Sequence, residues 1–77
     1  MGMTYVDKYI HDTFDNSFFK IEEEPAFFQG KKVMDQHGDF LIVEGIPFKN
    51  SILVHDKNKI DKFIFDEKMS DWIFENQ

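Results

Sequence analysis

The middle third of the chain places the strongest limit on the fold, because it reads almost continuously as β-strand. Lys31 to Asp35 and Asp39 to Glu44 flank Gln36-His37-Gly38, a sequence typical of a hairpin loop. Within the second segment, Phe40-Leu41-Ile42-Val43 is an unbroken apolar run, which predicts a central strand covered on both faces. Ser51 to His55 predicts a further strand. An antiparallel sheet is therefore the expected framework.

Residues 4–15 carry a helical period instead. Apolar side chains recur on one side at about 100° per residue, and charged side chains occupy the other side. Thr4, followed three residues later by Asp7, resembles a capping box and predicts where this helix begins. The apolar side is formed by Val6, Tyr9, Ile10 and Phe14.

The remaining segments are shorter and less regular. Residues 18–21 could form a short strand, which the acidic run before Pro25 would close as a sheet edge. Residues 60–66 favour a strand, with a helix as the rival, and residues 69–75 favour a short helix because Met69, Trp72 and Ile73 share a helical stripe. We therefore expect a single α+β domain over residues 1–77. An N-terminal amphipathic helix packs on an antiparallel sheet of three to five strands, and a short C-terminal helix follows.

Apolar material is plentiful for a chain of this length. The sequence has ten Phe, one Trp and only 77 residues, so some aromatic side chains are expected to exceed what one core can hold. Such side chains would be available to a partner or to a second copy of the chain. The residues expected in the core are Ile10, Phe14, Phe40, Ile42, Val43 and Leu53.

Composition also excludes several classes of protein. The chain has no Cys, so neither a disulfide framework nor a thiolate site is available. No apolar run approaches the roughly 18 residues of a membrane span, and the N-terminus lacks a charged-then-apolar leader. The expectation is a soluble cytoplasmic protein that does not bind membranes.

No catalytic or metal site is predicted. His11, His37 and His55 lack convergent ligands at metal-binding spacing. Asp35, His37 and Asp39 alternate in one loop and could hold a hard cation loosely, but a polar hairpin loop explains them more simply. The hydroxyl residues fit caps, turns and core positions. We therefore predict no enzyme, no cofactor and no metal.

Charge is distributed unevenly along the chain. The formal net charge is -6, there is no Arg, and acids outnumber Lys by six to two in residues 1–24 and by five to two in residues 61–77. Residues 25–60, by contrast, hold four acids and five Lys. Acidic ends repel a nucleic-acid duplex and attract a basic protein surface. The residues expected to contact such a partner are Asp7, Asp12, Asp15, Glu22, Glu23, Glu24, Asp66, Glu67, Asp71, Trp72, Phe74 and Glu75.

The function expected from this pattern is protein binding. A small acidic domain can act as a stoichiometric inhibitor that covers a basic, nucleic-acid-binding surface of a partner, such as a nucleic-acid-processing enzyme, without binding nucleic acid directly. The AT-rich codon bias implied by abundant Lys, Ile and Asn suits an inhibitor from a phage or mobile element. The alternative is a self-associating assembly module, such as a homodimer, whose acidic surface only keeps it soluble.

Overall fold

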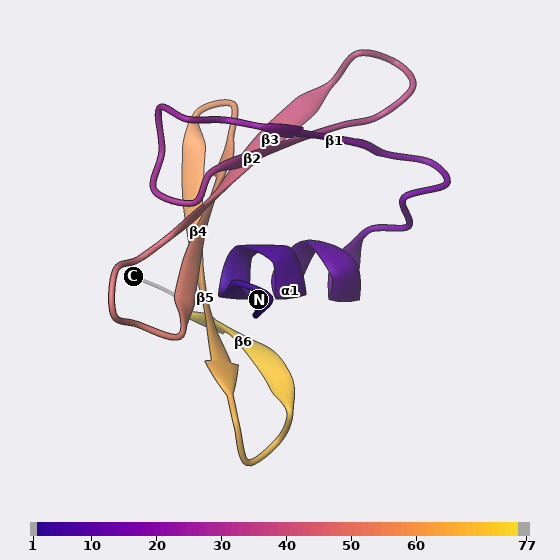
Figure 1. Cartoon of the computed structure of the whole chain (residues 1–77). Helices are drawn as coiled ribbons and strands as arrows, with labels where there is room; N and C mark the ends of the chain where they lie inside the picture. The colour runs from indigo at the N-terminus through magenta and orange to yellow at the C-terminus, as the bar shows by residue number, and fades with distance from the viewer. Residues whose placement is uncertain (1, 76–77) are drawn as a thin grey trace.

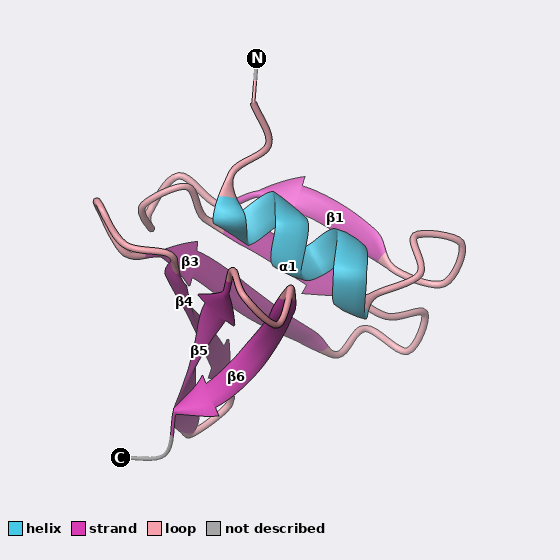
Figure 2. Cartoon of the chain, turned by 90° about the horizontal axis from the view of Figure 1, so that it is seen from below, coloured by secondary structure: helices cyan, strands magenta, loops and turns pink. Residues whose placement is uncertain are grey.

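The computed structural model describes residues 2–75, and over this range it forms one helix and a six-stranded antiparallel sheet (Figure 1). The strands are arranged in sequence order, so each one pairs with the next along the chain. The helix lies on one face of the sheet, with β1 on one flank and the β5–β6 hairpin on the other (Figure 2). The elements are α1 (Tyr5–Thr13), β1 (Lys20–Glu23), β2 (Lys31–Met34), β3 (Phe40–Gly45), β4 (Ser51–Asp56), β5 (Lys59–Asp66) and β6 (Asp71–Glu75).

The predicted N-terminal helix is confirmed. Thr4 is its N-cap, and the Thr4 hydroxyl oxygen accepts a hydrogen bond of 3.0 Å from the backbone N–H of Asp7. The helix ends at Thr13, because Phe14 is already extended and its N–H closes the last turn on the Ile10 carbonyl. α1 is nine residues long, and within residues 2–75 no helix has the length and apolarity to cross a membrane.

The core lies between α1 and the helix-facing side of the sheet. Val43 pairs with Val54 across β3 and β4, and Ile52 pairs with Gly45, so these positions share one face. Gly45 is buried, and a Cβ there would lie 2.8 Å from Gln29 Oε1 and 3.4 Å from the side chains of Phe28 and Val6. The fully or nearly buried apolar residues are Val6, Tyr9, Ile10, Val33, Val43, Ile52, Val54 and Phe65.

The predicted core is only partly correct. Ile10 and Val43 are buried as expected, whereas Phe14, Ile42 and Leu53 are half-buried and Phe40 is 49% exposed. Side chains alternate along β3, so its odd-numbered members face α1 and its even-numbered members face the opposite side. The one helix of the described chain lies on the first side. The prediction that this strand is covered on both faces was therefore wrong.

The predicted C-terminal helix is also wrong, because residues 71–75 form β6. Trp72 and Phe74 face the α1 side of the sheet, where they contact Tyr9 and Phe63, and Ile73 faces the other side opposite Ile64. This alternation is the period of a strand, not of a helix. With β1 and β6 both formed and residues 60–66 in β5, the sheet has one strand more than the three to five expected.

Candidate functional site

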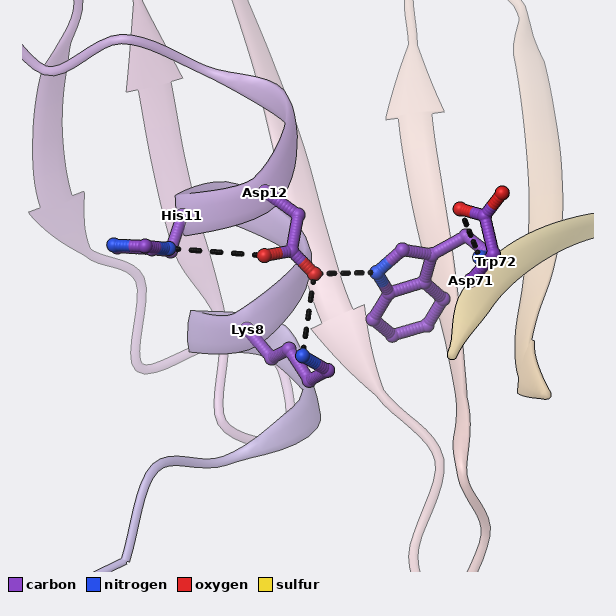
Figure 3. A network of polar contacts seen from close by, with 5 residues as sticks. All are labelled: Lys8, His11, Asp12, Asp71 and Trp72. Carbon is purple, nitrogen blue, oxygen red and sulfur yellow. Dashed lines mark hydrogen bonds and ion pairs between the residues drawn. The ribbon is translucent and has the colours of Figure 1, made fainter. Parts of the chain in front are cut away.

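The two acidic ends of the sequence meet where α1 lies beside the β5–β6 hairpin. The indole Nε1 of Trp72 donates a hydrogen bond of 3.1 Å to Asp12 Oδ2, and the Tyr5 hydroxyl donates one of 3.0 Å to Glu67 Oε1. Figure 3 shows Trp72 on β6 pointing toward Asp12 on the helix. We call this region the α1–β6 seam. Its polar residues are Tyr5, Lys8, Asp12, Glu67, Asp71 and Trp72.

An aromatic cluster fixes the geometry of the seam. The Trp72 ring packs edge-on against Tyr9 at a centroid distance of 5.3 Å and against Phe65 at 5.2 Å. Tyr5 contacts the same indole at 6.4 Å. Lys8 Nζ lies 4.6 Å from the centre of the Phe65 ring, which holds the ammonium group against the cluster. Trp72 and Tyr5, which donate hydrogen bonds to Asp12 and Glu67, are therefore packed into one aromatic cluster.

Asp12 is the most connected carboxylate of the seam. In addition to the Trp72 bond, its oxygens lie 3.4 Å from Lys8 Nζ and 3.7 Å from His11 Nδ1 (Figure 3). The Trp72 hydrogen bond is the largest single cause that holds the pKa of Asp12 below its ordinary value. Lys8 and His11 lower this pKa further. The bond to Glu67 acts in the other direction on Tyr5 and raises the pKa of its phenol. The Trp72 hydrogen bond therefore favours the ionised form of Asp12.

Replacing Trp72 with Phe is expected to raise the Asp12 pKa, because the variant keeps an aromatic ring but loses the indole donor. Lys8→Gln should raise it as well, because Lys8 lowers this pKa through both its charge and a hydrogen bond. Because the pKa of Asp12 is lower in the folded protein than in the unfolded chain, its ionised form stabilises the fold at pH values above the unfolded pKa. This stabilisation is lost as the pH falls through the folded pKa. Carboxyl-carbon NMR titration of the two variants measures the shifts. An Asp12 pKa that does not rise in Trp72→Phe would contradict the assignment.

Part of the predicted partner-binding set does not join the seam. Asp7 lies on the opposite flank of α1, with its carboxylate 3.8 Å from Lys31 Nζ, and Glu23 of β1 forms an ion pair with the same ammonium group. The Glu23 contact raises the pKa of Lys31, with smaller help from Asp7. On β1, Glu22 pairs with Lys20 at 3.3 Å. Lysines thus neutralise much of the charge at this flank.

The other predicted residues have separate roles. Asp15 accepts a hydrogen bond from the Ser17 N–H in the turn after α1, and Asp66 accepts bonds from Lys68 and Met69 in the β5–β6 turn. Glu75 lies 3.4 Å from Lys62. Five of the predicted acids, together with both predicted aromatic residues, are brought to the β6 side of the molecule. They are Asp12, Asp66, Glu67, Asp71 and Glu75, with Trp72 and Phe74.

A second acidic region, of which the sequence indicated only the loop residues Asp35 and Asp39, lies at the other end of the sheet. Asp35, Asp39 and Asp56 line a hollow of about 250 Å³ together with aromatic side chains. Asp35 Oδ1 accepts bonds of 2.8 Å and 3.1 Å from the His37 and Asp39 N–H groups, so the loop role expected for this residue is confirmed. No cluster of three or more His, Asp or Glu suited to a metal occurs within residues 2–75. The register that brings Asp56 beside the β2–β3 loop is not readable from local sequence.

Comparison of the chain with known proteins gave no match to a family model, to a curated protein or to a solved structure.

Proposed function

We propose that this protein is a small acidic binding protein that docks on a basic surface of a partner protein through the α1–β6 seam. The partner surface is one that otherwise binds nucleic acid, so the domain acts as a stoichiometric inhibitor by covering it. No chemical step is required of the domain itself.

The observation that supports this proposal is the joining of the two acidic ends of the chain. The Trp72–Asp12 and Tyr5–Glu67 hydrogen bonds span 60 and 62 residues of sequence and place the acidic end of α1 beside an acidic hairpin. Within residues 2–75, Asp66, Glu67 and Asp71 make no ion pair with a Lys or His side chain. Their charge therefore remains available to attract a cationic surface.

The anchoring of two seam carboxylates favours this use. Trp72 and Tyr5 donate hydrogen bonds to Asp12 and Glu67 from a packed aromatic cluster, so a surface built to hold phosphates can accept these carboxylates with little reordering. Complementary charge also raises the association rate more than it raises the affinity. Fast association suits an inhibitor that competes with nucleic acid.

Affinity capture with the full chain tests the proposal. A basic protein should be retained from host lysate at low salt and released by about 0.5 M salt, because exposed charges are then strongly screened. Addition of nucleic acid to the lysate should displace the captured protein. A partner that stays bound in high salt, or one that binds nucleic acid and the domain together, would contradict the proposal.

A second candidate function is self-association, and exposed aromatic residues favour it. Phe48 is 104% exposed with a φ of 65°, at the turn between β3 and β4. With Met3 and Phe28, which are 63% and 47% exposed, it borders a single hollow next to the start of α1. Sedimentation of the wild-type chain and of Phe48→Ser distinguishes the two candidates. A wild-type dimer that dissociates in the variant supports an assembly module, and a monomer in both rejects it.

A further inference from the structure

The outer edge of β6 has unpaired backbone groups, and their identity follows from the hydrogen bonds of β5. The Phe65 N–H donates to the Asn50 carbonyl at 2.9 Å, and the Phe65 carbonyl accepts from Asn50 Nδ2 at 2.6 Å. The polar groups of Phe65 therefore face β4, and those of the neighbouring Ile64 face β6. Since Ile64 is paired with Ile73, the N–H and C=O groups of Trp72 and Phe74 point outward.

This edge is open within the described chain. β5 is the only strand that pairs with β6 in residues 2–75. The outward N–H of Trp72 donates instead to the Asp71 carboxylate at 2.8 Å, which agrees with the direction derived above. An open edge of this kind is a template for an added strand.

The side chains of β6 determine which strand fits. Asp71, Ile73 and Glu75 alternate along the side of the sheet that faces away from α1, so this side presents acid, apolar, acid at strand spacing. Ile73 is 41% exposed. Asp66 lies directly opposite Asp71, and neither makes an ion pair within residues 2–75, so an added cation would relieve a like-charge pair.

A second copy of β6 fits this edge poorly in the register that pairs all five residues. Antiparallel pairing centred on Ile73 would place Asp71 opposite Glu75 of the other copy at both ends. Like charges directly opposite each other destabilise a strand pair. The same arrangement attracts a strand that has a cation at each of these positions.

We propose that the β6 edge binds an extended basic segment of the partner protein as a seventh strand. The segment has the pattern basic, any, apolar, any, basic, in which the two basic residues face Asp71 and Glu75 and the apolar residue faces Ile73. The residues between them exchange backbone hydrogen bonds with Trp72 and Phe74. This inference rests on the proposed function, because it specifies how the basic partner docks.

The probe is a capped synthetic peptide with the core Lys-Thr-Val-Thr-Lys, titrated into the full chain and followed by amide NMR. Binding should shift the Trp72 and Phe74 amides and protect the Phe74 N–H from exchange. N-methylation of both Thr residues should weaken binding by about tenfold or more, because each loses a backbone hydrogen bond in the strand pair. N-methylation of the Val should not, because its N–H points away from β6. The Glu-Thr-Val-Thr-Glu peptide should not bind.

Phe74→Pro is the corresponding change in the protein, since it removes an outward N–H that β5 does not use, and Phe74→Ala is its matched control. The Pro variant should lose peptide binding and the Ala variant should keep it. If the Thr-methylated peptide binds as well as the parent peptide, and its binding still depends on Asp71, then the peptide docks through charge alone. Strand addition would be overturned by that result. If no Lys peptide binds at low salt, the β6 edge does not bind a basic strand. The proposed function is tested separately, by affinity capture of the partner.

Discussion

Ile52→Ala is expected to destabilise the domain by about 2–5 kcal/mol, the usual range for removing most of a buried Ile side chain. Ile52 has no solvent exposure and is among the largest fully buried side chains of the described residues. It pairs with Gly45 on one side and Phe63 on the other, beneath α1, so neighbouring atoms have little room to fill the cavity. A domain of this size has on the order of 5 kcal/mol of total stability, so the variant should be largely unfolded.

Thermal unfolding followed by circular dichroism measures this effect. Ile60→Ala is the matched control, because it makes the same chemical change at a β5 position that is 59% exposed. The control should melt within a few degrees of the wild type. An Ile52→Ala variant that melts no lower than the control would show that the core is not between α1 and β4.

Neutralising the seam acids without changing their shape should weaken partner binding by about tenfold to a hundredfold, most of it through slower association. The variant is Asp12→Asn, Glu67→Gln and Asp71→Asn. Each amide oxygen can still accept the hydrogen bond now made by Trp72 Nε1, the Tyr5 hydroxyl or the Trp72 N–H. The fold should therefore survive while three negative charges are lost.

The control carries the same change in net charge at other positions. Glu24→Gln, Asp39→Asn and Asp56→Asn also remove three charges, from residues that make no ion pair within the described chain and do not belong to the seam. Affinity of each variant for the captured partner is compared at one salt concentration. Equal loss in both variants would mean that net charge, not the seam, attracts the partner.

The local elements were the predictable part of this fold. The Thr4 cap and the spacing of Val6, Tyr9 and Ile10 predict α1, and Gln36-His37-Gly38 predicts the β2–β3 hairpin, because each signal lies within a few residues. β6 was mistaken for a helix because Met69, Trp72 and Ile73 fit a helical stripe. Pairing with β5, which the local sequence does not reveal, decides in favour of a strand.

The candidate site was predictable as a set of residues but not as an arrangement. The sequence indicates that Asp7 and Asp12 both lie on the polar side of a helix. It does not show that Lys31 meets Asp7 on one flank while Trp72 meets Asp12 on the other. These contacts join residues 24 and 60 positions apart, and they depend on how α1 crosses the sheet. The position of α1 on the sheet therefore separates the acids that lysines neutralise from the acids that can contact a partner.

If charge at the α1–β6 seam brings the partner to the domain, the association rate should depend on salt through the seam acids. Surface plasmon resonance with the captured partner gives this rate for the wild type and for the two neutralised variants. We expect the rate to fall steeply between low salt and about 0.5 M for the wild type and the control, and to depend little on salt for the seam variant. A wild-type rate that does not change with salt, or a seam variant as steep as the wild type, would contradict this expectation.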